Sequence, residues 1–243
     1  MEMNDFDVIV IGGGINSMIA ASLLGQAGRK VTILEAREET GGMASTVEFT
    51  KGFQCNLIND YIRWIDPRLF RTLNLKVHGL VLHYPDIMRV ALEENGRHIF
   101  FHRNPKQTAE SIKRHSGMDA EKWPEFSNYI GKCTRFLEPL YALTPPRAKN
   151  IGVSDALKLR SLLKPLLKQG TKGLTNLIRV IPMMMPELMD EWFESKFLRG
   201  ALSSAGITRL TQGPFSAATG LNFLHQHVHA QGVIHNAFFV QEV

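Results

Sequence analysis

A glycine-rich turn and one acidic residue are the groups in this sequence whose spacing predicts chemistry. The turn reads Gly12-x-Gly14-x-x-Ser17, and Glu35 follows Gly14 by 21 residues. In this pattern the first glycine permits a tight turn, the second lets the backbone approach a pyrophosphate, and the third position must be small. Ser17 departs from glycine there but is still small. The pattern predicts a dinucleotide site in which Glu35 binds ribose hydroxyls and repels a 2′-phosphate, which disfavours NADP.

The elements around the turn are expected to form a right-handed βαβ unit. Phe6 to Ile11 is a continuous apolar run, which predicts a buried parallel strand. Ile15 to Ala27 is expected to be a helix ended by Gly28, and Val31 to Leu34 the second strand. Free N–H groups at a helix start favour anions. The groups expected to hold the phosphates are therefore Gly12, Gly13, Gly14, Ile15, Asn16 and Ser17.

A second motif distinguishes FAD from NAD. Glu35-Ala36-Arg37 runs on to Gly41-Gly42. This run resembles the E-A-R-x-x-x-G-G motif of amine-oxidase-like and phytoene-desaturase-like flavoproteins. The resemblance implies FAD as cofactor and places the glycine pair near its pyrophosphate and ribityl chain. It adds five residues to the expected site: Ala36, Arg37, Gly41, Gly42 and Met43. Many members carry arginine where Met43 stands, so no arginine contact is expected at that position.

The resemblance continues beyond the first fifty residues, more loosely. Val47 to Phe53, Leu73 to Tyr84 and Trp192-Phe193-Glu194-Ser195 are similar to segments of phytoene-desaturase-like proteins. The most similar branch is the phytoene-dehydrogenase-related oxidoreductases. The resemblance implies an FAD-dependent oxidoreductase of dehydrogenase, desaturase or oxidase type that acts on an apolar or amine-like small molecule.

The expected fold class is α/β, with a Rossmann-like FAD-binding βαβ unit and an α+β substrate or cap region. Residues 1–75 are predicted to be the N-terminal segment of the FAD domain, and residues 76–243 the cap region. Members of the superfamily return to the FAD domain near the C-terminus, and no such segment is found here. Two strands bury little and leave edges unpaired, so other strands must complete the sheet. The chain's own middle, a partner chain or a C-terminal half outside this sequence could supply them, and the last two together are favoured.

Periodicity and turn residues predict the remaining elements. Expected strands are Val81–Tyr84, Met88–Leu92, His98–His102 and Asn236–Val240. Expected helices are Pro67–Leu73, Pro105–Ser116, Ala120–Leu137 and Pro186–Ser204.

Composition excludes several classes of protein. Apolar residues make up 44% of the 243, which supports a folded core, and the two cysteines form no CxxC pair. No apolar stretch is long enough to span a membrane, and a cytoplasmic location is expected. Residues 147–181 carry eight basic residues against one acidic residue, interleaved with leucines. Such a segment suits either peripheral contact with an anionic membrane or a solvated helix face; nucleic acid is not predicted as a partner.

Three further groups have mainly structural interpretations. His225, His227, His229 and His235 lie close in sequence without nearby carboxylate or cysteine ligands, so no metal site is predicted. Core or interface packing is the favoured role for Met183, Met184 and Met185. Cys55 is expected to be a buried structural thiol.

Three hypotheses follow for function. The first is an FAD-dependent oxidoreductase, active alone or as part of a split or truncated enzyme. The second is a non-catalytic nucleotide-binding partner or scaffold subunit. The third, an NAD-dependent dehydrogenase, is disfavoured by Gly41-Gly42. No residue is assigned as the catalytic base.

Overall fold

The computed structural model describes residues 5–56, 58, 62–142, 167–168, 170–230 and 239–241. The chain divides into two compact units, and each is described by itself. The first unit comprises residues 1–84 with 238–243, and the second unit comprises residues 85–237. The division falls at Tyr84, later than the domain boundary expected at residue 75.

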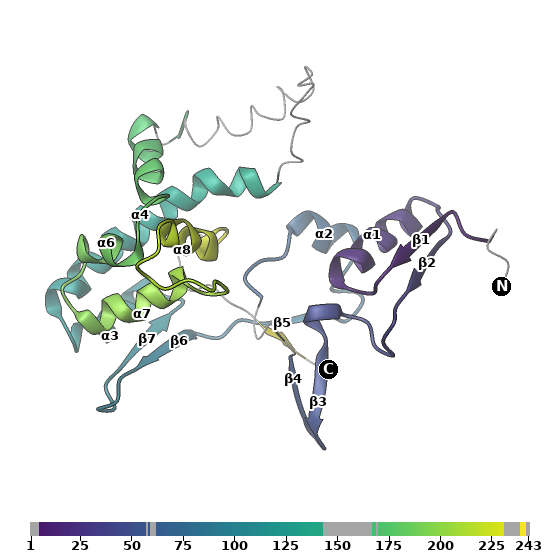
Figure 1. Cartoon of the computed structure of the whole chain (residues 1–243), viewed down its shortest axis with the longest axis horizontal. Coiled ribbons are helices and arrows are strands. Elements are labelled where there is room, and N and C mark those ends of the chain that lie inside the picture. The colour runs from purple at the N-terminus through teal and green to yellow at the C-terminus, as the bar shows by residue number, and fades with distance from the viewer. Residues whose placement is uncertain are drawn as a thin grey trace. The chain divides into compact units, whose positions relative to one another are not determined.

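The first unit begins with the expected strand–helix–strand crossover (Figure 1). Strand β1 is paired in parallel with β2, and Val8 is opposite Val31. The α/β class is thereby confirmed. The elements of this crossover are β1 (Val8–Ile11), α1 (Ile15–Gln26) and β2 (Val31–Leu34).

The prediction that the first strand is buried was wrong. Ile9 is half exposed and Ile11 is 85% exposed. The cause is the size of the sheet, because β1 pairs only with β2 among the described strands. An apolar run predicts that a strand can be buried, but other elements must be present to cover it.

The rest of the first unit consists of short elements around two antiparallel strand pairs. The pair β3–β4 and the pair β5–β8 are each two-stranded. Strand β8 confirms the end of the strand expected over Asn236–Val240, whose first three residues lie outside the described part of the chain. The bounds are the 3₁₀ helix η2 (Gly42–Ala44), β3 (Thr46–Thr50), β4 (Phe53–Asn56), α2 (Pro67–Thr72), β5 (Val81–His83) and β8 (Phe239–Gln241).

The second unit packs helices on one face of the hairpin β6–β7. Alternation along β7 turns Ile99 and Phe101 into the core, where both are fully buried. Hydroxyl groups of α3 cover the free edge of β7: Ser111 Oγ accepts from Phe100 N at 2.9 Å, and Thr108 Oγ1 from His102 N at 2.8 Å. The bounds are β6 (Ile87–Leu92), β7 (His98–His102), α3 (Pro105–Lys113), α4 (Gly117–Ala142), α6 (Met185–Asp190), α7 (Lys196–Gly206) and α8 (Thr219–His227), with a further helical segment over 170–180.

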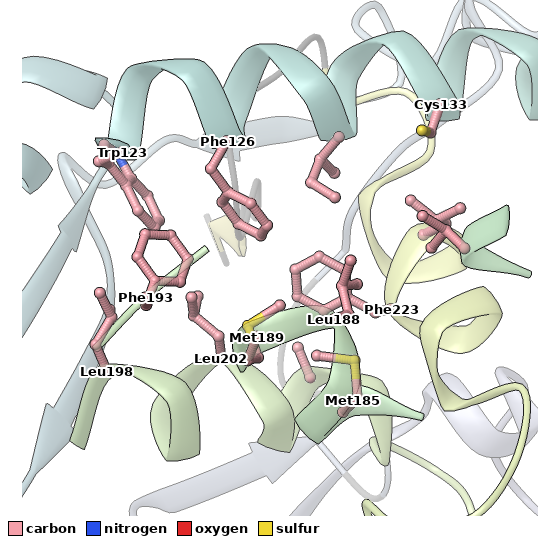
Figure 2. Packing of buried hydrophobic residues seen from close by; sticks show 14 of the residues in the cluster. Trp123, Phe126, Cys133, Met185, Leu188, Met189, Phe193, Leu198, Leu202 and Phe223 are labelled. Carbon is pink, nitrogen blue, oxygen red and sulfur yellow. The ribbon is translucent and has the colours of Figure 1, made fainter. Parts of the chain in front are cut away.

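The core of the second unit is built around aromatic side chains of α4. Figure 2 shows Trp123 and Phe126 pointing from α4 toward Phe193 and the residues of α6 and α7. The Phe126 and Phe193 rings meet edge to face, with centroids 4.9 Å apart. Met185 is fully buried in this cluster, which agrees with the packing role expected for the methionine run.

The single helix expected over Pro186–Ser204 is in fact two helices, α6 and α7. A tertiary contact holds the loop between the two helices. The buried carboxylate of Asp119, on the first turn of α4, accepts hydrogen bonds from Glu194 N at 2.8 Å and Ser195 N at 2.9 Å. Ser195 then caps α7, because its Oγ accepts from Leu198 N. Hydrophobic periodicity does not register this contact, because Asp119 is 75 residues away from Glu194, and the local cap signal of Ser195 is what marks the start of α7.

Candidate functional site

The glycine turn lies between the end of β1 and the start of α1. Gly12 has φ +92°, which L side chains rarely adopt, and its N–H donates to Leu34 O at 2.7 Å. This bond ties the turn to the end of β2. Helical hydrogen bonding begins directly afterwards, with Met18 N donating to Gly14 O at 2.9 Å.

The N-terminus of α1 faces outward with its backbone donors available. Gly14 is the N-cap, and no side chain of the described residues caps this end. Ile15 and Asn16 are exposed, while Ser17 is half buried. The first N–H groups of a helix have no partner within it, and they carry the positive end of the helix dipole. This end of α1 therefore suits a phosphate group.

Glu35 places a negative charge beside the turn. Its carboxylate accepts hydrogen bonds from Gly13 N at 2.5 Å and from Arg37 N at 3.1 Å. These two bonds, the one from Gly13 first, lower the pKa of Glu35 below its ordinary value of 4.5. Glu35 is thus ionised at neutral pH. An ionised carboxylate accepts hydrogen bonds from ribose hydroxyls and repels a third phosphate.

The glycine pair Gly41-Gly42 packs directly against the glycine turn. Gly41 N donates to Gly13 O at 2.8 Å, and Gly14 and Gly41 form a parallel bridge. Both members of the pair have positive φ, +117° and +63°. A Cβ on Gly42 would lie 3.2 Å from Gly14 Cα, so a side chain there would push the two loops apart. Because neither residue of the pair has a side chain, the two backbone segments can contact each other directly.

The space around the glycine turn is open enough for a pyrophosphate. A Cβ built on Gly12 or Gly14 meets nothing within 4 Å, so the backbone at both positions faces open space. A Cβ on Gly13 would instead lie 3.0 Å from Thr40 Cγ2 and 3.1 Å from a Glu35 carboxylate oxygen. A side chain on Gly13 would therefore crowd Thr40 and Glu35, whereas Gly12 and Gly14 leave open the approach that a diphosphate needs.

The structure therefore brings most of the predicted site residues together. The turn, the start of α1, Glu35 and Gly41-Gly42 meet at one end of the β1–β2 pair. Arg37 is tied to Glu35 by its backbone N–H and by an exposed ion pair at 4.0 Å, and Ala36 lies between them. Met43 is 68% exposed in η2, with no contact that assigns it a role. Sequence reasoning missed Thr40, and also Ser45, which is buried and donates from Oγ to Gly42 O at 2.8 Å.

Other candidate residues do not converge on a second site of this kind. His225 contacts Tyr141, and His227 is buried with Nδ1 2.6 Å from Phe223 O. His235 lies outside the described residues, among which no group of three metal-ligating side chains is found. Most of the basic segment 147–181 also lies outside them. Within the described chain, no helix is long and apolar enough to cross a membrane.

The cysteines correct one expectation. Cys55, expected to be buried, is exposed on β4 because the β3–β4 pair has both faces open to solvent. Cys133 is buried on α4, and burial raises its pKa to about 12. Neither thiol is in a disulfide bond in the described chain.

Comparison with known proteins gives the same picture for the N-terminal residues. Residues 10–74 match the family described as an NAD(P)-binding Rossmann-like domain. The chain is 26% identical over 234 residues to a rat protein called pyridine nucleotide-disulfide oxidoreductase domain-containing protein 2, covering 91% of this chain and 40% of that protein. It is 37% identical over 125 residues to a limonene dehydrogenase subunit of Castellaniella defragrans, covering 51% of this chain and 23% of that protein.

Oxidases also occur among the similar proteins. Human flavin-containing amine oxidase B is 40% identical over 68 residues, which are 28% of this chain and 13% of that enzyme. Among solved structures, putrescine oxidase bound to putrescine matches with a TM-score of 0.52 at 15% identity, covering 97% of this chain and 46% of that one. At that identity the match concerns the fold alone. This chain spans 40% or less of the length of these curated relatives.

Proposed function

We propose that the first unit binds the ADP part of FAD and that the chain functions in an FAD-dependent oxidoreductase. The observation that carries the proposal is the meeting of three features at one place. These are the open glycine turn, the uncapped start of α1 and the ionised Glu35 held on Gly13 N–H.

Each group has a defined part in binding. The backbone of Gly12 and Gly14 admits the pyrophosphate closely, and the first N–H groups of α1, from Ile15 to Ser17, donate to its oxygens. The free lone pairs of Glu35 accept from the ribose hydroxyls. Gly41-Gly42 keeps the second loop beside the pyrophosphate, with Ala36, Arg37 and Met43 at its margin. FAD, when bound, supplies the redox chemistry by accepting a hydride from the substrate.

The choice of FAD over NAD is supported by the Gly41–Gly14 contact and by the flavin-containing relatives. The names of two relatives, an amine oxidase and a limonene dehydrogenase subunit, support an apolar or amine-like small molecule as substrate. The phytoene-dehydrogenase-related branch remains part of the proposal, although no relative named above carries that name. No catalytic residue is assigned.

A partner that completes the β1–β2 sheet is part of the proposal. Strands β1 and β2 pair only with each other among the described strands, so further strands can pair with their outer edges. Elements packed on the completed sheet would cover exposed apolar side chains such as Ile11 and Leu34. One relative is named as a subunit, which supports a second chain as the source. The alternative, a non-catalytic nucleotide-binding subunit, uses the same site and differs only in lacking turnover.

Titration of the purified full chain with FAD, NAD⁺ and NADP⁺, followed by intrinsic fluorescence, tests the ligand. We expect FAD to bind most tightly and NADP⁺ most weakly. Glu35→Arg should weaken FAD binding at least about 100-fold. It removes the charged acceptor of the ribose hydroxyls and introduces a cation that the backbone N–H groups of the turn repel. Glu38→Arg is the matched control, because Glu38 is exposed and only three residues from Glu35 in the sequence. Unchanged FAD affinity in Glu35→Arg would refute the ribose assignment.

A second pair of variants separates binding from folding. Gly14→Ala and Gly25→Ala each add a methyl group that meets no neighbour in the protein. Both variants should keep the fold, as measured by circular dichroism and thermal melting. Only Gly14→Ala should lose FAD, because its methyl group would occupy the approach of the pyrophosphate. If both retained FAD equally, the proposed position of the pyrophosphate would be wrong.

A further inference from the structure

A cleft of about 340 Å³ lies on the second unit, lined by residues of α3 and β7. That volume is at the lower end of the range for small-molecule sites. The strand contributes Phe100 and His102 to its wall, and α3 contributes a row of polar side chains. None of these residues belongs to the dinucleotide site.

Strand alternation and a hydrogen bond position the wall of the cleft. Phe100 lies between the buried residues Ile99 and Phe101, so alternation along β7 places its ring on the opposite face, in the cleft. The buried hydroxyl of Ser111 accepts from Phe100 N at 2.9 Å and ties the helix to the strand at that point. The cleft thus has an aromatic surface that folding alone positions.

Three charges line the helical side of the cleft in a fixed order. Lys106, Glu110 and Arg114 follow one another at intervals of four residues, so they share one face of α3 and its C-cap. All three are exposed, and no ion pair joins them to another described residue. The order is positive, negative, positive, with the amide of Gln107 beside it.

This arrangement complements a molecule that carries both charges. A simple anion would meet Glu110 beside each cation, and a simple cation would meet Lys106 or Arg114 beside Glu110. A zwitterion satisfies both, because side chains one helical turn apart are about 5–6 Å apart at Cβ, within reach of adjacent ammonium and carboxylate groups. The ring of Phe100 provides an apolar contact for a third group.

We propose that this cleft binds a free α-amino acid with an apolar or aromatic side chain. Glu110 accepts from the ammonium group, Lys106 or Arg114 donates to the carboxylate, and the side chain lies against Phe100. The site is independent of the flavin proposal, since it uses no residue of the first unit.

Calorimetric titration of the full chain with L-phenylalanine tests the proposal. The comparison ligands are 3-phenylpropionate, which lacks the amine, and phenethylamine, which lacks the carboxylate. We expect saturable binding of L-phenylalanine at one site, at least about tenfold tighter than either comparison ligand, because each lacks one charge-assisted contact. Absence of saturable binding, or equal affinity for all three, overturns the proposal.

Variants locate the site. Glu110→Gln should lower the affinity for L-phenylalanine about tenfold without lowering the affinity for 3-phenylpropionate. The double variant Lys106→Gln, Arg114→Gln should leave the affinity for phenethylamine unchanged. Lys113→Gln is the matched control on the same helix, exposed but outside the cleft. All four substituted positions are on the surface, so circular dichroism should show unchanged folding. If Lys113→Gln weakened binding as much as the cleft variants, the cleft would not be the site.

Discussion

The two units differ in where they place their hydrophobic side chains. In the second unit, residues from the hairpin and the helices enclose Trp123 and Phe126 in one continuous core. Among the described residues of the first unit, the buried hydrophobic side chains are Ala21 and Leu73, while Ile11 and Phe49 are exposed. Yet the first unit carries the dinucleotide motif. A nucleotide site built from glycine backbone and one carboxylate needs little core of its own, so binding and stability should respond to different substitutions.

The largest contrast is expected from one aromatic truncation in each unit. Phe126→Ala removes a fully buried ring and should lower the free energy of unfolding by about 4 kcal/mol, through lost burial and a cavity. Phe49→Ala removes a ring that is 65% exposed and should change it by less than about 1 kcal/mol. Urea unfolding followed by circular dichroism measures both. Comparable losses would contradict the contrast between the units.

Asp119 tests whether the second unit depends on a buried polar contact as well as on its core. Asp119→Ala leaves two backbone N–H groups, on Glu194 and Ser195, without their acceptor. The expected loss is about 3 kcal/mol of unfolding free energy. Glu121→Ala, an exposed site on the same helix, should change it by less than about 0.5 kcal/mol. An Asp119→Ala protein as stable as the control would show that the contact is dispensable.

Two glycines of the second unit, Gly220 and Gly200, test how closely its helices pack. A Cβ on Gly220 would lie 2.6 Å from Val180 O, so Gly220→Ala should destabilise by about 2 kcal/mol. Gly200, inside α7, has open space around its Cβ position. Gly200→Ala should therefore stabilise by about 0.5–1 kcal/mol through helix propensity. Thermal melting gives both signs, and the same sign for both variants would count against the packing described.

The reactivity of the two cysteines tests the contrast between the enclosed core of the second unit and the exposed strands of the first, without mutation. Cys133 is buried, and its pKa is raised to about 12, so almost none of it is the reactive thiolate at pH 8. Cys55 is exposed. A thiol reagent should titrate one cysteine in the native chain and two in denaturant. Two fast-reacting thiols in the native chain would mean that the core around α4 opens readily.

The smallest effect is the pH dependence of the glycine turn. The folded pKa of Glu35 is lowered, so its contribution to stability is present above the ordinary value of 4.5 and is lost as the pH falls through the folded pKa. The Gly13 amide resonance should titrate with a midpoint below 4.5, and Glu35→Gln should abolish that titration. A midpoint above 4.5 would contradict the hydrogen bond from Gly13.

The sequence predicted local features well and long-range ones poorly. The crossover, most element types and the meeting of Glu35 with the glycine turn followed from residue spacing over some thirty positions. The break between α6 and α7 did not: Ser195 is a local N-cap, but the hydrogen bonds that hold the intervening loop come from Asp119, 75 residues away from Glu194. Thr40 and Ser45 were missed because their roles depend on how two loops pack together.

By itself, the sequence predicted the place where we propose that a dinucleotide binds, because glycine conformation and a helix start are local properties of the chain. It also determined which segments are apolar enough to be buried. Only the tertiary structure decided which of them are buried. Helix α4 packs in one core with α6, α7 and α8, whereas β1, which pairs with β2 alone among the described strands, stays open to solvent. Burial depends on what covers a surface, and a local sequence pattern does not contain that information.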